Sequence, residues 1–287
     1  MSAYAYSVLA VIGLNVMLAV SLNMISGFCG QFSLGHAAFY GAGAYTAAFL
    51  AAGGSPVPLA LLAGVAVAAL LGVVVGFASL RLRDDFLAVT TIGVSFLFVG
   101  FVRKQAWLGA EMGISRIPPS GLGDEGNALL ILFCALATIA LSLYVRRSWM
   151  GFSFRAVGDD EGAARSIGIS ITAYKLAAFT LGTGIAGLAG GLYAYFTQFI
   201  VPDSFGFIVS VMLMAMVVIG GTGSTLGVVA AAIILTLLPE FFRFMNDYRL
   251  LVFGALLVLV VRFAPGGLAG IGRAAVAKAR GPGRARQ

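Results

Sequence analysis

Apolar residues run along this chain in long, nearly uninterrupted stretches that short polar segments separate. The stretches lie at residues 5–25, 33–52, 57–80, 86–102, 128–145, 176–199, 208–219, 226–239 and 250–263. Most of them reach the roughly 17–25 residues that an α-helix needs to cross the hydrocarbon core of a bilayer. The pattern predicts an all-α, polytopic transmembrane helical bundle.

Two of the stretches are short, and a glycine-rich segment, GGTGST at residues 220–225, separates them. Short segments interrupted by glycine are typical of broken or re-entrant helices that line a cavity. We therefore expect about eight to ten spans in total, with such short segments counted among them.

Composition supports a membrane protein. The chain is 60% hydrophobic and only 10% charged, and its mean hydropathy is +1.02, whereas about a quarter of the residues in a soluble domain are charged. The net charge of +7 would suggest nucleic-acid binding in a soluble protein. In this chain it predicts loops that face an anionic membrane surface, so we expect contact with lipid and not with nucleic acid.

The positions of lysine and arginine predict the orientation. Three groups fall on one side when the predicted spans alternate, namely Arg81 and Arg83; Arg146, Arg147, Arg155, Arg165 and Lys175; and Arg262, Arg273, Lys278, Arg280, Arg284 and Arg286. The remaining residues fall on the other side, at Arg103, Lys104, Arg116, Arg243 and Arg249. Because cytoplasmic loops carry the excess of basic residues, the larger set predicts a cytoplasmic C-terminus.

A polar segment at residues 146–175 carries the signals of a short, self-capped helix. Asp159 is placed to cap its start, Asp160 and Glu161 lie in its first turn, and Gly168 is placed to end it. Its apolar members, Val157, Ala164 and Ile167, are expected to share one side. A solvated connector is the simpler alternative, but a connector needs no capped helix, so we interpret this one as a surface offered to a partner protein.

Small residues recur at helical spacing, as in GIAGLAGG at residues 184–191 and in the Gly72–Gly76 pair. Such residues let helix backbones approach closely in lipid. The same density is also expected of helices that line a transport path, and density alone does not separate these two interpretations.

No catalytic or metal-binding constellation is present in the sequence, which has one histidine, two cysteines and no G-x-x-x-x-G-K-[ST] phosphate loop. Ionisable residues are sparse within the predicted spans, whereas carriers driven by protons or sodium usually place them there. The polar residues at mid-span are mainly Asn15, Asn23, His36, Thr90, Thr91 and Ser95. An energy source outside the chain is therefore favoured over a stand-alone secondary carrier or facilitator for a small polar solute, which is the alternative function.

Several segments, in order along residues 8–272, resemble the permeases of branched-chain amino acid ABC transporters, of the second-permease type in high-affinity Leu/Ile/Val import. They are LNMISGFCGQFSLGHAAFYGAGAY, RLRDDFLAVTTIGVSF, GFSFRAVGDDEGAARSIGISITAYKLAAF, MVVIGGTGSTLGVVAAAIILTLLPE and RFAPGGLAG. The resemblance implies a permease domain at residues 1–272 with a cytoplasmic coupling loop at 146–175, followed by a basic cytoplasmic tail at 273–287. It also implies a multi-pass protein of the bacterial inner membrane that imports branched-chain or related amino acids; other members handle urea or short amides.

The same resemblance implies the partners: a companion permease, two cytoplasmic ATPase subunits and a periplasmic substrate-binding protein. ATP would be bound by the ATPases, with no cofactor in this chain. The implied ATPase-coupling residues are Asp159, Asp160, Glu161, Ala163, Ala164, Arg165 and Gly168. The pattern departs from the usual Glu-Ala-Ala of importers, because Gly162 follows the glutamate.

We expect residues 27–45 to form a bent helix packed near the pore. The candidate pore or helix-packing residues are Gly30, Ser33, Gly35, His36, Gly41, Gly184, Gly187, Gly191, Gly220, Gly221 and Gly223. For His36 three roles remain open: a packing and hydrogen-bonding residue, a direct substrate contact, or a protonation switch.

Overall fold

The computed structural model describes residues 3–79, 84–115, 117–241 and 266–270, together with residues 254, 258 and 262. Helices dominate this part of the chain. They are α1 (Ala3–Ser26), α2 (His36–Ala52), α3 (Val57–Ser79), α4 (Asp84–Lys104), α5 (Gly123–Arg147), α6 (Trp149–Asp159), α7 (Glu161–Ser166), α8 (Ile171–Thr197), α9 (Phe207–Gly220) and α10 (Thr225–Phe241), with short 3-10 turns η1 (Ala106–Leu108), η2 (Ala110–Met112) and η3 (Pro202–Phe205).

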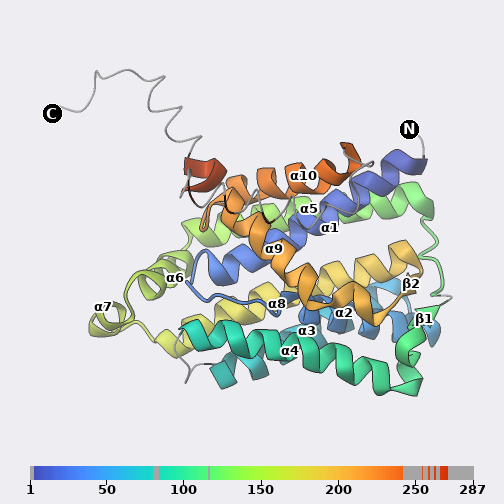
Figure 1. Cartoon of the computed structure of the whole chain (residues 1–287), viewed down its shortest axis with the longest axis horizontal. Helices are drawn as coiled ribbons and strands as arrows, with labels where there is room; N and C mark the ends of the chain where they lie inside the picture. Colours follow the sequence, from blue (N-terminus) through green and yellow to red (C-terminus); the bar gives the residue numbers. More distant parts are fainter. Residues whose placement is uncertain are drawn as a thin grey trace.

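The long helices lie side by side along the longest axis of the molecule (Figure 1). Beyond one end of the bundle lie α6 and then α7, which is farther out; we call this the α7 end. At the other end β1 (Ile114–Ser115) pairs antiparallel with β2 (Phe199–Ile200), with Ile114 opposite Ile200. We call this the hairpin end.

Within the described residues, six helical segments are long and apolar enough to cross a membrane, which confirms the all-α polytopic bundle. They are Tyr4–Ser26, Val57–Ala78, Phe86–Lys104, Gly123–Arg147, Ile171–Thr197 and Pro202–Gly220. Helices α2 and α10, of 17 residues each, pack in the same bundle. The predicted stretch at residues 250–263 lies outside the described residues except for residues 254, 258 and 262.

The buried centre of the bundle is formed by α1, α2 and α8. Helices α2, α3 and α8 pack against one another, and α1 packs against α5, α8 and α10. By contrast, α3, α4 and α5 expose most of their apolar side chains, as expected of helices that face lipid or another membrane subunit.

The bent helix expected at residues 27–45 is wrong: α1 ends at Ser26, an irregular segment follows, and α2 begins at His36. The break occurs where Gly30 adopts the left-handed conformation, with φ +72°. The irregular segment is mostly buried. At membrane depth, non-helical backbone is tolerated only where protein covers it, which is the situation here.

Helix directions separate the basic residues as the sequence predicts, where they are described. Arg103 and Lys104 end α4 at the hairpin end, while Arg146, Arg147 and the basic residues of α6 to α8 gather at the α7 end (Figure 1). Arg81, Arg83, Arg116, Arg243, Arg249 and the tail at 273–287 lie outside the described residues.

Candidate functional site

The short helix expected in the 146–175 segment exists as α7, and it is capped at both ends. The Asp160 carboxylate accepts a hydrogen bond from the backbone N–H of Ala163 at 3.0 Å. At the other end Gly168 has φ +84°, its N–H donates to the Arg165 carbonyl at 3.1 Å, and the N–H of Ile169 donates to the Ala164 carbonyl at 3.0 Å. This pair of bonds is the Schellman pattern, which ends a helix without help from a partner.

The N-cap assigned to Asp159 is wrong by one residue. Asp159 is the last residue of α6, and the chain becomes extended only at Asp160, with φ −157° and ψ 110°. Because an N-cap residue must lie outside the helical conformation, Asp160 takes that position.

We expect Asp160→Ala to lower the stability of α7 by about 0.5–2 kcal/mol, the usual cost of removing an N-cap. The matched control is Asp159→Ala, one residue earlier, whose side chain does not cap α7. Amide hydrogen exchange of residues 161–169 measures the effect. Equal loss of protection in both variants would contradict the assigned cap.

Helix α6 was not predicted. Its Phe154 and Val157 are buried in a small core with Met24, Phe28 and Ala164, separate from the main core of the bundle. The Phe154 ring packs edge-on against Tyr174 of α8, at a centroid distance of 6.1 Å. The sequence signal for α6 is the three-residue spacing of Phe154 and Val157. This spacing covers a single helical turn between polar residues, which is too short to predict a helix.

Helix α7 is seated on α8 through an ion pair between Glu161 and Lys175. Ala164 is 2% exposed and faces the small core. Both residues, predicted to meet a partner, are therefore used within the chain. Ile167 is 72% exposed, so the expectation that it shares one side with Val157 and Ala164 is also wrong.

Helix α6 touches the irregular segment at residues 27–35. A β-carbon built on Gly30 would lie 3.1 Å from the Cα of Gly158, near the end of α6. The Gln31 side-chain amide donates to the backbone carbonyl of Lys175 at 3.0 Å, and Ser26 Oγ donates to the Gln31 carbonyl at 2.9 Å. Lys175, whose side chain pairs with Glu161 of α7, thus also accepts a hydrogen bond from this segment through its backbone carbonyl.

From there the contacts continue into the bundle. The Leu34 N–H donates to Thr91 Oγ1 of α4 at 3.0 Å, and the Ala37 N–H, in the first turn of α2, donates to Ser210 Oγ of α9 at 2.9 Å. A β-carbon on Gly35 would collide with the Thr91 backbone. Ser33 is fully buried in the same segment. The α7 end and the start of α2 are therefore connected by one continuous set of contacts.

His36, the first residue of α2, is fully buried, and its Nε2 lies 2.8 Å from Ser21 Oγ. The Ser21 hydroxyl donates to the Leu18 carbonyl at 2.9 Å, an arrangement that matches the His36 tautomer with its proton on Nε2, while the buried Nδ1 has no hydrogen-bond partner among the described residues. This neutral, hydrogen-bonded arrangement favours the packing role among the three.

We expect His36→Gln to keep a folded protein, because the glutamine amide can still donate to Ser21. His36→Ala, which leaves a cavity and removes that donor, should lower the free energy of unfolding by about 1–3 kcal/mol more. Thermal unfolding in detergent compares the two variants. Equal and severe losses in both would show that the imidazole itself is required.

The predicted glycines differ in how closely they are packed. A β-carbon at Gly187 would lie 2.7 Å from the Gly64 carbonyl oxygen and closer still to the Ala68 methyl group. At Gly191 it would lie 2.7 Å from a Leu61 methyl group. Gly184 has room, because its β-carbon would meet only ordinary contacts at 3.6 and 3.7 Å.

The remaining predicted glycines lie in two places. Gly41 sits under the rings of Phe98 and Phe205. Gly220 touches α10 at Val228, and Gly221 and Gly223, with φ +97° and +78°, form the turn between α9 and α10. The Gly223 N–H donates to Asn23 Oδ1 of α1 at 2.9 Å. The sequence did not single out three further glycines that allow close contacts between α2, α3 and α8, namely Gly43, Gly64 and Gly190.

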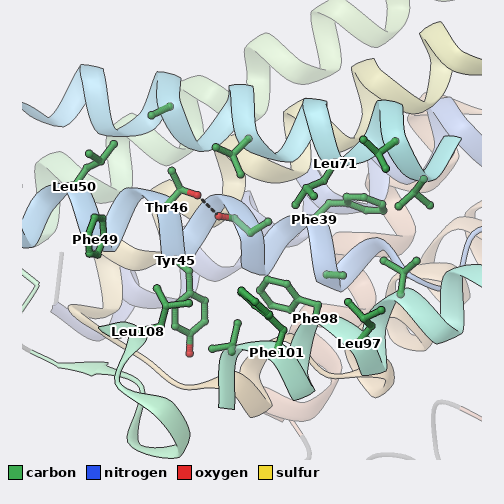
Figure 2. Close-up of a pocket in the computed structure, with 18 of the residues that line it drawn as sticks. Phe39, Tyr45, Thr46, Phe49, Leu50, Leu71, Leu97, Phe98, Phe101 and Leu108 are labelled. Atoms are coloured by element: carbon green, nitrogen blue, oxygen red, sulfur yellow. Dashed lines mark hydrogen bonds between the residues drawn. The ribbon is translucent and has the colours of Figure 1, made fainter. Parts of the chain in front are cut away.

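A cavity of about 800 Å³ lies between α2, α3, α4 and η1. Figure 2 shows its lining, which is almost wholly apolar, with Phe39, Leu71, Leu97 and Phe98 facing it. The Thr46 hydroxyl on its wall already donates to the Ala42 carbonyl at 2.7 Å. The cavity supplies no charged group, so it does not suit a zwitterionic amino acid. Within the described residues no group of three His, Cys, Asp or Glu side chains is arranged to hold a metal ion.

Comparison with known proteins gives a consistent result. The family model for the permease component of branched-chain amino acid transport systems matches residues 4–261. The chain is 35% identical to the high-affinity branched-chain amino acid transport system permease protein LivM of Salmonella typhimurium and 34% identical to that of Escherichia coli, in each case over 88% of this chain and 67% of the relative.

More distant similarity extends to a second kind of permease. Over 50% of this chain and 47% of the relative, the chain is 30% identical to the high-affinity branched-chain amino acid transport system permease protein LivH of Escherichia coli. No solved structure matches the chain significantly.

Proposed function

The chain belongs to the family of permease components of branched-chain amino acid transport systems, and from this premise we propose that it is one permease subunit of an ABC importer for branched-chain or related amino acids. The observation that carries the proposal is α7, a self-capped helix placed beyond the bundle and joined by contacts to the start of α2. A structure of this kind suits transmission of movement from a separate ATPase into the bundle.

The proposed complex contains this chain, a companion permease, two ATPase subunits that bind ATP, and a substrate-binding protein. The similarity to both LivM and LivH relatives supports a companion permease. The sequence contains no phosphate loop of its own, which supports ATP binding by other chains.

We further propose that the protein lies in the bacterial inner membrane with its α7 end in the cytoplasm. The described basic residues support this orientation, because five of them gather at the α7 end as Arg146, Arg147, Arg155, Arg165 and Lys175. The basic tail at residues 273–287 would lie on the same side. The hairpin end, with β1, β2 and η1, would then face the substrate-binding protein.

The test is reconstitution of the chain with its companion permease, ATPases and binding protein in liposomes. We expect concentrative uptake of radiolabelled leucine only when ATP is supplied on the ATPase side. Omission of the ATPases should abolish uptake even under a proton or sodium gradient. Gradient-driven uptake without them would instead support a secondary carrier.

A further inference from the structure

Helix α6 has two different faces. One face, with Phe154 and Val157, is buried against the chain. The other carries large apolar side chains that the described chain leaves mostly exposed: Trp149 is 81% exposed and Phe152 is 57% exposed. Tyr144, in the preceding turn of α5, is 71% exposed.

This uncovered face begins where α5 leaves the membrane-spanning region. The apolar segment of α5 ends at Arg147, and Trp149 starts α6 two residues later. In Figure 1 α6 lies beside the end of the bundle, whereas α7 projects farther. Tryptophan and tyrosine at this depth are typical of the boundary between acyl chains and headgroups.

The charged residues close to the aromatic face in the chain are all basic. Arg146 and Arg147 form the last turn of α5, and Arg155 lies over the Phe152 ring at 4.8 Å. Residues 126–158 contain no Asp or Glu. Acidic residues at this end of the molecule lie elsewhere in the chain: Asp84 and Asp85 begin α4, and Asp159, Asp160 and Glu161 lie in the last turn of α6 and the start of α7.

Arg155 and Arg147 differ in their surroundings. Arg155 donates to the carbonyls of Gly151 and Arg146, at 3.2 and 3.3 Å, and so holds α6 against the end of α5. Arg147 is exposed and precedes Trp149, which is also exposed, by two residues. A guanidinium group beside an exposed tryptophan suits a phosphate group above an acyl chain.

We propose that the first half of α6 lies in the headgroup layer of the membrane, with Trp149 and Phe152 among the upper acyl segments and Arg146 and Arg147 against anionic phospholipid. The occupant of this face is the lipid surface, and charge complementarity distinguishes it from neutral lipid. Helix α6 then fixes the depth of α7, which continues from it. This inference concerns α6 alone and does not depend on what α7 binds.

Trp149 reports on its own position, because the chain contains two tryptophans and the other is Trp107 near the hairpin end. The Trp107→Phe variant of the full chain is placed in phosphatidylcholine nanodiscs that contain lipids brominated at defined acyl positions. We expect bromines near the ester to quench Trp149 emission more than bromines near the methyl end, and acrylamide in the water to quench weakly. Water-like emission with strong acrylamide quenching would overturn the proposal.

The anionic preference is tested in the same system. Brominated phosphatidylglycerol, as a minor component, should quench Trp149 more than the same amount of brominated phosphatidylcholine, because each arginine near the surface favours anionic lipid about fivefold. In Arg146→Gln/Arg147→Gln the two lipids should quench equally, while Lys104→Gln at the hairpin end should retain the difference. Equal quenching by both lipids in the Trp107→Phe protein with its arginines intact would overturn the anionic part.

A protein partner on this face would behave differently. If Trp149 were exposed to water in nanodiscs and became shielded only when the ATPases were added, α6 would be a protein-docking helix and the lipid assignment would be wrong. If the lipid assignment holds, adding the ATPases leaves the quenching by brominated lipid unchanged.

Discussion

Gly187→Leu should yield no folded permease, and Gly187→Ala should lower its stability by about 1–3 kcal/mol or more, the usual effect of overpacking. The reason is the crossing of α3 and α8, where the Gly187 backbone lies against Gly64 and Ala68. A β-carbon there meets a backbone carbonyl at 2.7 Å, and a helix backbone cannot move aside as a flexible side chain can. Thermal unfolding and folded yield in detergent measure both variants.

The chain offers a matched control three residues earlier on the same helix. Gly184→Ala adds the same methyl group at a site with ordinary contacts at 3.6 and 3.7 Å. It should be neutral or raise stability by about 0.5–1 kcal/mol, because alanine favours a helix over glycine. Equal effects of alanine at both positions would show that close approach of α3 and α8 is not what position 187 requires.

Reversing the charge of Glu161 should dislodge α7 and disconnect it from ATP hydrolysis. In Glu161→Lys two cations replace the ion pair with Lys175, whose side chain is only 11% exposed. We expect about a tenfold fall in substrate-stimulated ATP hydrolysis by the reconstituted complex, which corresponds to ~1.4 kcal/mol. Amide protection in residues 161–169 should fall with it.

The double variant Glu161→Lys/Lys175→Glu separates this internal pair from contacts with a partner. It restores opposite charges, so α7 should regain its amide protection. The exposed positions test the partner directly: Ala163→Arg and Ile167→Asp should leave α7 folded but reduce ATPase retention in a pull-down. Full retention and full hydrolysis in both exposed variants would make α7 a connector only.

The membrane-spanning helices were accessible from sequence because lipid imposes a simple requirement: an apolar run of sufficient length. That requirement identifies α1, α3, α4, α5 and α8, although α5 and α8 each begin about five residues before their apolar runs. The apolar stretches at 5–25 and 33–52 place a break between α1 and α2. Its buried, irregular course over residues 27–35 was not predicted, because the groups that bury it, such as Thr91, Lys175 and Ser210, lie far away in the chain.

In the candidate site, too, local features could be predicted from the sequence, whereas features that depend on distant contacts could not. The capping residues of α7 are local, so its existence and its end at Gly168 follow from the sequence. The choice between Asp159 and Asp160 depends on where α6 ends, and α6 depends on burial of Phe154 beside α8. Their helical spacing predicts close packing for Gly184 and Gly187 alike. The position of α3 decides that only Gly187 is closely packed.

The position of α2 has a consequence for biogenesis. Its Gly43 backbone lies against Gly187, Gly190 of α8 touches the Tyr40 carbonyl, and the N–H of Ala37 is satisfied by Ser210 of α9. A nascent chain contains α2 long before the ribosome has synthesised α8 and α9. Until then the small-residue face of α2 and its first-turn amide have no native partner. The segment should therefore remain loosely inserted, or be held by the insertion machinery, and reach its final place only late in synthesis.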